Sequence, residues 1–223
     1  MTTLLQEAVD NNVAWCARVC RSHGVLGQYG DGWWVTLSAA PTYYPDAMTL
    51  GVGASLETLP RMAVERAGAA VKDSFASVEL AGLEVAIEAS WIGYERPAAD
   101  PDPGWSVVRT AGQLAAWMVA HGEAPAIRPD LLADLDVRVL AAFVDGCAVA
   151  GLIAYRTGSV VGVSNVFLGG DNGWPAAVAA VAGCFPGLPL VGWESEAMLR
   201  SALAAGFRCL GPMRVWRRPA SSA

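Results

Sequence analysis

The sequence predicts an α/β (α+β) protein with a mixed, mostly antiparallel sheet, flanked by helices and built from two tandem repeats. Aligning Gly82 with Gly206 brings two apolar runs, 83–92 and 207–216, into register. The repeat spacing exceeds about 100 residues, too long for a solenoid, which favours a duplicated domain or half-domain. An Asp145-Gly146 pair between apolar runs predicts a β-hairpin. A glycine-rich turn at 169–173 follows another apolar run and precedes a helix-like segment.

Residues 1–96 are expected to form a reduced, degenerate copy of the second repeat. Apolar residues at helical spacing predict a helix over 4–22, and glycines from Gly24 to Gly32 end it. Pro60 fits the first turn of a second helix, where its missing N–H costs little. The remaining expectations are an end to that helix near Gly68 and strands over 33–38, 48–54, 71–75 and 83–94.

Residues 97–104 contain three prolines, two aspartates and a glycine, which predicts a stiff, solvated linker. The second repeat then covers 105–218, and 219–223 form a tail. Thr110 is the expected N-cap of its first helix. The expected strands are 105–109, 137–144, 148–155, 160–168, 189–193, 208–210 and 213–217, and the helices are 110–121, 129–135, one from Pro175 to about Gly183, and 195–205.

Composition excludes several classes of protein. Hydrophobic residues make up 54% and charged residues 16% of the 223 residues, which gives ample core material. No apolar run approaches about 18 residues and the N-terminus lacks a basic region, so neither a membrane span nor a signal peptide is expected. Five cysteines without a CxxC pair are typical of reduced thiols in a cytoplasmic protein. With only His23 and His121, no metal site is expected.

The net charge of −6 is distributed unevenly along the chain. Residues 1–104 hold 6 Lys+Arg and 13 Asp+Glu (−7), whereas residues 105–223 hold 9 and 8 (+1). An acidic first half repels nucleic acid and anionic membranes, so neither is an expected partner. It would attract a cationic ligand such as an amine, or it serves only as a solvated surface that keeps the protein soluble.

Three features of residues 105–218 resemble the GNAT superfamily of acyl-CoA-dependent N-acetyltransferases. The glycine-rich turn after 160–168 matches the position of the family's pyrophosphate loop. The segment LVGWESEAMLRSALAAGF matches its strand-helix unit ending in Gly-Phe, and GPMRVWRR matches its last hairpin. The resemblance implies acetyl-CoA as cosubstrate, a small-molecule or protein amine as acceptor, and a cleft where two central strands separate. It also allows a homodimer.

The same resemblance implies where acetyl-CoA would bind. The pantetheine arm would run along Asn165, Val166, Phe167 and Leu168, and the phosphates would meet the turn formed by Gly170, Asp171, Asn172, Gly173 and Trp174. Unpaired amides at a helix N-terminus favour an anion in general. The turn departs from the family pattern, because Gly170 replaces Gln or Arg, Pro175 removes one amide donor, and Asp171 adds negative charge. A plain strand-to-helix connection is the alternative.

The chemistry implied by the resemblance needs a base, a donor to the thioester carbonyl and an acid. The backbone N–H of Val166, or of Phe167, is the candidate donor. Glu194 is the candidate base, although Glu194 and Glu196 would also stabilise the N-terminus of the next helix. The family's acidic tyrosine is replaced by Ala202. A catalytically impaired protein that acts as a CoA-binding sensor or scaffold is therefore the alternative function.

The first repeat offers an acceptor site or simply a small core. Aromatic residues could line a pocket in which Asp46 or Asp73 holds an ammonium group, or they could fill the interior. Lys72, the only lysine, would form a surface ion pair with the adjacent Asp73. The segment 50–54 is too short to wrap a pyrophosphate, so no second CoA is expected there. The aromatic residues are Trp33, Trp34, Tyr43 and Tyr44.

Overall fold

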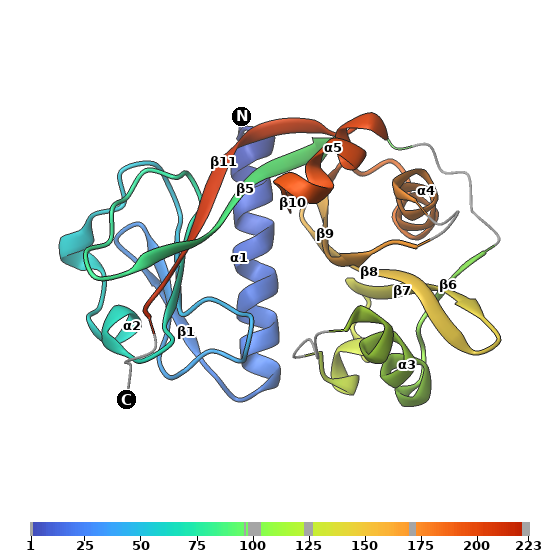
Figure 1. Cartoon of the computed structure of the whole chain (residues 1–223), viewed down its shortest axis with the longest axis horizontal. Coiled ribbons are helices and arrows are strands. Elements are labelled where there is room, and N and C mark those ends of the chain that lie inside the picture. The colour runs from blue at the N-terminus through green and yellow to red at the C-terminus, as the bar shows by residue number, and fades with distance from the viewer. Residues whose placement is uncertain (1, 96, 98–103, 123–126, 170–172, 220–223) are drawn as a thin grey trace.

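The computed structural model describes residues 2–95, 97, 104–122, 127–169 and 173–219 (Figure 1). The helices are α1 (Leu4–Ser22), η1 (Leu56–Thr58), α2 (Met62–Glu65), α3 (Ala111–His121), η2 (Pro129–Ala133), α4 (Trp174–Cys184) and α5 (Glu196–Ala204). The strands are β1 (Gly27–Gly30), β2 (Trp33–Thr36), β3 (Ala47–Thr49), β4 (Ala70–Asp73), β5 (Glu84–Tyr94), β6 (Trp105–Val107), β7 (Val137–Val144), β8 (Cys147–Thr157), β9 (Val160–Phe167), β10 (Leu190–Ser195) and β11 (Arg208–Arg217).

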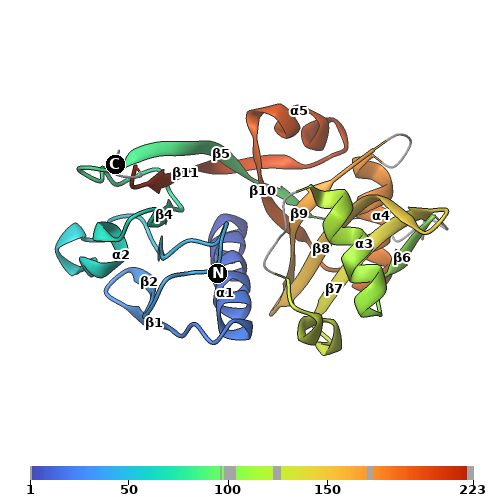
Figure 2. The same ribbon diagram turned by 60° about the horizontal axis from the view of Figure 1, so that its bottom comes forward.

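All described strands join one sheet in the order β1-β2-β3-β4-β11-β5-β10-β9-β8-β7-β6. Its pairs are antiparallel except for β3 with β4 and β9 with β10. Helices cover the sheet on both sides, so the predicted mixed, mostly antiparallel α/β class is confirmed (Figures 1 and 2). The predicted hairpin is also present, since Asp145 and Gly146 both have positive φ between β7 and β8.

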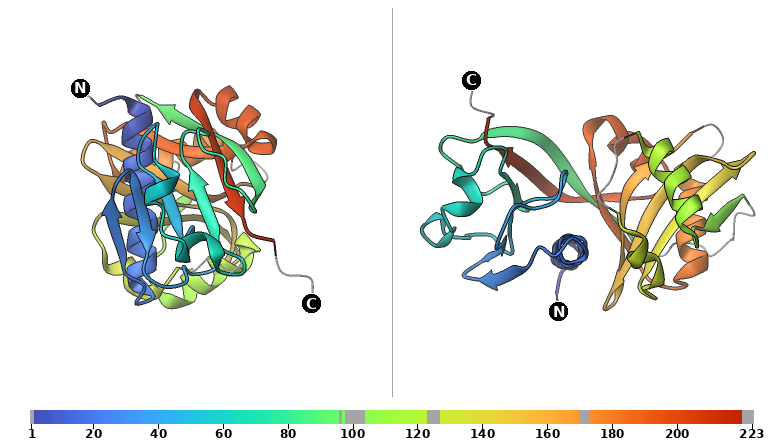
Figure 3. Two further views of the ribbon diagram at one scale, coloured as in Figure 1. Left: turned by 90° about the vertical axis from the view of Figure 1, so that its left-hand side faces the viewer. Right: turned by 90° about the horizontal axis from the view of Figure 1, so that it is seen from below.

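The two halves of the chain exchange their long strands at the centre of the sheet. β5, from the first half, pairs with β10 of the second, and β11, from the second half, pairs with β4 of the first. β5 and β11 also pair with each other and arch over α1 (Figure 3). The expectation of two final strands forming a hairpin is wrong, because 208–217 is one strand with a bulge between Cys209 and Gly211.

The long helix α1 lies between two flanks of the sheet, one built from β1 to β4 and the other from β6 to β10 (Figures 1 and 3). Buried Asn11 donates to the backbone oxygen of Tyr155 at 2.9 Å and to Thr157 Oγ1 at 2.7 Å. A Cβ on Gly162 would lie 1.8 Å from Asn11 Oδ1, so this close approach of helix to sheet requires glycine. Arg18 of α1 forms an ion pair with Asp134, which follows η2 and precedes β7.

Hydrophobic side chains form three buried clusters that fix these layers. The largest packs α1 and α3 against one face of the sheet, a second packs α4 and α5 against the other, and a small one fills the end near α2. Burial of this apolar surface is the main driving force for the arrangement. No helix within the described ranges combines the length and apolar character that a bilayer crossing requires.

The predicted second helix is wrong. Residues 56–65 form only the one-turn η1 and α2, because Pro60 between them lacks the N–H needed to continue a helix. Gly27–Gly30, expected to be loop, pairs with β2 as strand β1. Most of the 97–104 linker and of the 219–223 tail lies outside the described residues. We propose that the flanks descend from duplicated units, 1–96 and 105–218, because each contains one parallel strand pair next to an exchanged strand.

Candidate active site

The parallel strands β9 and β10 separate after a short contact. Their described pairing joins Leu190 to Val161 and Val191 to Gly162 and ends there. Beyond this point β10 pairs with β5 and β9 pairs with β8, each on its outer side. The wedge between two central strands that the sequence predicted is therefore present, and no described strand pairing joins the inner edges of β9 and β10 beyond Gly162 and Val191.

A bulge lies in β9 where the strands separate. Ser164 faces Ile153 and Phe167 faces Gly151, so three residue steps on β9 match two on β8. Asn165 has a φ of 52°, a left-handed conformation in which asparagine is one of the better-tolerated residues. Bulges redirect the local backbone and are frequent beside active sites. In the described strand pairings, Asn165 and Val166 are matched to no partner.

The wedge opens into a cavity of about 370 Å³ between the two flanks. Ser164, Asn165 and Val166 line it from β9, and Trp193, Glu194 and Ser195 line it from β10. The other walls come from α1, from the segment before β3, from β4, from the exchanged strands β5 and β11, and from the end of α3. Those wall residues are Asn12, Trp15, Cys16, Tyr43, Tyr44, Pro45, Ala70, Lys72, Ile87, His121, Val215 and Arg217.

Glu194, the candidate base, lines the cavity from β10. Burial raises its pKa from the ordinary 4.5 to about 7, because the low-polarity surroundings disfavour the carboxylate. A base with a pKa near 7 is well matched to proton transfer at neutral pH. Helix α5 begins at Glu196, so Glu196 lies in its first turn, whereas Glu194 lies on β10 and faces the cavity.

No acid replaces the missing tyrosine on α5. Ala202 is buried in the hydrophobic core and packs in the same cluster as Phe207. Among other side chains that could donate a proton, Ser164 lines the cavity, whereas Cys209 is exposed and Tyr155 lies outside the cavity. The described part of the chain therefore places no dedicated proton donor on α5 beside the wedge.

The proposed phosphate turn is only partly described. Gly170, Asp171 and Asn172 lie outside the described residues. Gly173 is the N-cap of α4 and Trp174 is its first residue. Trp174 is buried in the core with its ring 4.9 Å from that of Phe207, and it does not line the cavity. Phe167 and Leu168 are half-buried, and Phe167 packs against Trp117 and His121.

The expected acidic wall for an ammonium group is wrong. Asp46 accepts hydrogen bonds from the amides of Ala40 and Ala70 and pairs with Arg66, and it does not line the cavity. Asp73 is also buried, and its carboxylate holds the turn after β4 through the amides of Phe75 and Val78. Both carboxylates therefore make structural hydrogen bonds and are not available to bind an ammonium group, and the sequence alone does not reveal these contacts.

Lys72 is not a surface ion-pair residue, contrary to the prediction. It is buried, lines the cavity, and donates from Nζ to Asn12 Oδ1 at 2.9 Å. Its Nζ lies 4.6 Å from the centre of the Trp193 ring, a cation–π distance. Burial lowers its pKa below the ordinary 10.5. The available signal was that the only lysine sits inside an apolar strand.

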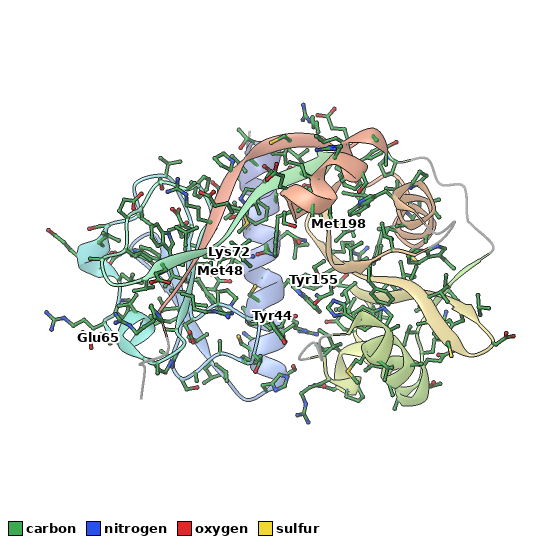
Figure 4. All side chains as sticks on the ribbon, in the orientation of Figure 1. Tyr44, Met48, Glu65, Lys72, Tyr155 and Met198 are labelled. Carbon is green, nitrogen blue, oxygen red and sulfur yellow. The ribbon has the colours of Figure 1, made fainter. Side chains whose placement is uncertain are left out.

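The aromatic residues of the first half divide between the two predicted roles. Trp33 and Trp34 are core residues, and Trp33 Nε1 donates to the backbone oxygen of Ser55 at 2.9 Å. Tyr43 and Tyr44 line the cavity, and Figure 4 shows Tyr44 and Lys72 beside α1 between the flanks. No group of three or more possible metal ligands occurs in the described ranges.

The first flank has no comparable wedge at its own parallel pair. Beyond the contact of Met48 with Lys72, Ser74 N donates to Thr49 Oγ1 at 2.7 Å and Ser74 Oγ donates to the Thr49 oxygen at 2.9 Å. These two bonds hold the ends of β3 and β4 together. The open wedge is thus a feature of the β9–β10 pair.

Comparison with known proteins supports a fold assignment. No protein-family model matches the chain, and no curated protein matches its sequence. Among solved structures, a Novosphingobium aromaticivorans protein assigned to the GNAT acetyltransferase family gives a TM-score of 0.64 at 14% identity, covering 96% of this chain and 99% of that one. A GCN5-related N-acetyltransferase from Kribbella flavida gives 0.62 at 16% identity, covering 92% and 95%.

A conserved protein of unknown function from Staphylococcus epidermidis gives a TM-score of 0.60 at 7% identity, covering 86% of this chain and 93% of that one. Identities this low establish the fold and leave the activity to be argued from the site. The similarities extend over nearly the full length of each protein, so they include both flanks and the exchanged strands. Together with the separated parallel strands, they show that this chain has the GNAT acetyltransferase fold.

Proposed function

We propose that this protein is an acyl-CoA-dependent N-acetyltransferase that transfers an acetyl group from acetyl-CoA to a small-molecule or protein amine. The observation that carries the proposal is the wedge between β9 and β10, which opens into a cavity lined by Glu194. The wedge provides unpaired main chain for a thioester arm, and the cavity provides room and a base for the amine.

The residues along the wedge fit acetyl-CoA. Asn165, Val166, Phe167 and Leu168 would hold the pantetheine arm, and the bulge frees backbone there for hydrogen bonding. The turn from Gly170 to Trp174 would receive the phosphates at the N-terminus of α4. Bound acetyl-CoA would supply the activated carbonyl carbon, which the amine nitrogen attacks as the carbon–sulfur bond breaks and CoA leaves as a thiolate.

Each residue then has a defined task. Glu194, as the carboxylate, accepts the proton that the amine loses when its nitrogen bonds to carbon. The N–H of Val166 donates to the carbonyl oxygen, where negative charge develops. The departing thiolate takes its proton from solvent, which is feasible because a thiol pKa lies only moderately above neutral. Loss of the tyrosine at Ala202 therefore slows this step without preventing it.

Ligand-linked stability tests whether CoA binds. The melting temperature and the tryptophan fluorescence are measured while acetyl-CoA or desulfo-CoA is titrated. Saturable stabilisation by both compounds is expected, since a ligand that binds the folded state raises its stability. The absence of any shift at millimolar concentrations of both would contradict acyl-CoA binding.

The pH profile of turnover tests the base. Release of free thiol from acetyl-CoA with an amine panel should increase as the pH rises through about 7, the pKa of Glu194. Glu194→Gln should lower the rate by about 10²- to 10⁴-fold and abolish this dependence. Glu196→Gln, which neutralises an exposed carboxylate on α5, is the matched control. An unchanged rate and profile in Glu194→Gln would exclude Glu194 as the base.

A CoA-binding sensor or scaffold without turnover is the second candidate function. The burial of Ala202 in the core, where the family has its acid, favours it. Saturable CoA binding without thiol release for any amine of the panel would support the sensor or scaffold function over the transferase. We also propose that the protein acts in the cytoplasm, consistent with its free cysteines, and that it forms a homodimer, which light scattering would test.

A further inference from the structure

The cavity wall carries a buried cation that has no anionic partner among the described residues. Lys72 is 5% exposed, and its Nζ contacts one amide oxygen, that of Asn12, and the face of Trp193. No carboxylate oxygen in the described part of the chain lies within salt-bridge distance of it. A buried ammonium group is normally paired with an anion, and burial without one lowers the pKa of Lys72, so an anionic ligand would stabilise its charged form.

Two further donors on the same wall are also unsatisfied. Trp15 Nε1 (residue 3% exposed) and the Tyr44 hydroxyl (9% exposed) are buried and form no hydrogen bond with the described residues. Burial raises the pKa of the Tyr44 hydroxyl, and the nearby side chains of Asn165 and Trp15 only partly oppose this shift, which places the neutral hydroxyl beside the β9 bulge. An unsatisfied buried polar group costs stability, so such groups in a cavity indicate a ligand with acceptors.

The charges of the cavity are arranged with opposite signs on the two flanks. Lys72 on β4 of the first flank and the exposed Arg217 on the neighbouring strand β11 line it. Glu194, on the second flank, is the one carboxylate among the described lining residues, and it forms no ion pair with Lys72. A ligand that spans the cavity therefore meets donors and positive charge at one side and a carboxylate at the other.

We propose that the acceptor is a small amine that also carries a carboxylate, with its carboxylate bound by Lys72, Tyr44 and Trp15 and its amine at Glu194. The inference rests on the proposed N-acetyltransferase function and narrows its substrate class. Lysine and tryptophan side chains only donate hydrogen bonds, whereas a carboxylate only accepts them, so the two sets are complementary. Polyamines and other purely cationic acceptors would place positive charge against Lys72.

Binding of matched compounds tests this inference without requiring turnover. The probes are the twenty protein amino acids and ω-amino acids from 3-aminopropanoate to 6-aminohexanoate, which vary the distance between amine and carboxylate. Each compound that binds is compared with its carboxamide and with the amine that lacks the carboxylate. Trp15 and Trp193 line the cavity, so tryptophan fluorescence reports occupancy directly.

At least one carboxylate-bearing amine should bind about tenfold or more tightly than its carboxamide, because a charged hydrogen-bonded group is lost. Lys72→Met, which keeps the length of the side chain, should remove most of this preference. Equal affinity for acid and amide would overturn the inference, and so would the absence of binding by every acid at 10 mM.

Tyr44→Phe separates ligand recognition from a structural role. Its hydroxyl forms no hydrogen bond with the described residues, so removal should leave the melting temperature unchanged or raise it. The same substitution should weaken binding of the carboxylate-bearing amine several-fold. Tyr94→Phe, at a half-buried tyrosine that packs on Phe207 away from the cavity, is the control and should leave binding unchanged. A destabilised Tyr44→Phe protein with unaltered affinity would indicate only packing.

The two proposals fail in distinguishable ways. Stabilisation by acetyl-CoA without any preference for carboxylates would leave the transferase proposal standing and refute the acceptor class. Carboxylate-dependent binding without any response to acetyl-CoA would show that the cavity is an acid receptor in a protein that is not a transferase.

Discussion

Glu194, the proposed base, carries a cost in stability. Its carboxyl group is largely buried and pairs with no cation among the described residues. Burial raises its pKa from 4.5 to about 7, so the folded protein holds this proton more tightly than the unfolded chain. The resulting stability is fully present below pH 4.5 and is lost as the pH rises through about 7.

Glu194→Gln should therefore stabilise the protein in alkaline solution. The shift corresponds to a loss on the order of 3 kcal/mol between pH 4.5 and 7 or slightly above, and glutamine, which does not ionise, avoids it. Urea unfolding at pH 4.5 and pH 8 measures the effect. The variant should gain stability over the wild type at pH 8 and little at pH 4.5. The same gain at both pH values would show that ionisation of Glu194 is not the cause.

The packing of α1 against β9 positions one wall of the cavity, because Asn12, Trp15 and Cys16 all lie on this helix. Gly162→Ala should disturb that contact, since the new methyl group would meet Asn11 Oδ1. Asn11 can move only by giving up its bonds to Tyr155 and Thr157. We expect a loss of about 1–3 kcal/mol in the free energy of unfolding, as is usual for overpacking.

Gly112→Ala is the matched control for this substitution. It lies in the exposed first turn of α3, where nothing described is within 4 Å of the new Cβ. Alanine favours helix, so this variant should be unchanged or more stable by up to about 1 kcal/mol. Denaturant midpoints of both variants decide the matter. Equal effects at the two glycines would show that the α1–β9 approach is less close than described.

Elements with local signals could be predicted from the sequence, and elements that depend on distant partners could not. The Asp145-Gly146 turn and the Thr110 cap, with its capping box to Gln113, are encoded within a few residues. The pairing partner of β11 is not encoded locally, because the alternating apolar pattern of β11 would fit any open sheet edge. The buried position of Lys72 follows from that long-range pairing, since β4 is enclosed only when β11 and α1 pack beside it.

The candidate site shows the same division. The separation of β9 and β10 could be predicted, because it follows from the order of helices and strands along the sequence. The cavity could not, because its walls come from two flanks that are brought together by the exchanged strands and by α1, which contacts both. The donors Trp15, Tyr44 and Lys72 belong to three separate segments of the first half. No spacing in the sequence indicates that they line the same cavity as Glu194.

The exchanged strands make the two halves of the chain interdependent. β5 completes the second flank beside β10, and β11 completes the first flank beside β4. Each half alone would leave a long strand without its partner and would expose large apolar side chains of that strand, such as Trp91 on β5 and Met213 on β11. We therefore expect unfolding in a single cooperative transition, in which neither flank melts before the other.

Cutting the chain between the halves tests this interdependence. A protease site replacing residues 98–103 would give two pieces, one ending after β5 and the other beginning before β6. The pieces should remain associated after cleavage and co-elute in gel filtration at low and high salt, because antiparallel pairing from Arg208–Gly93 to Arg217–Glu84 and the core beneath it hold them together. They should separate only in denaturant, and the melting temperature should fall and become dependent on concentration. Dissociation into two folded pieces at micromolar concentration would show instead that each flank is a self-sufficient domain. In that case the cavity would lie at an ordinary interface between two domains. The loss of affinity for the carboxylate-bearing amine on cleavage would then measure how much binding depends on the covalent link between the two pieces.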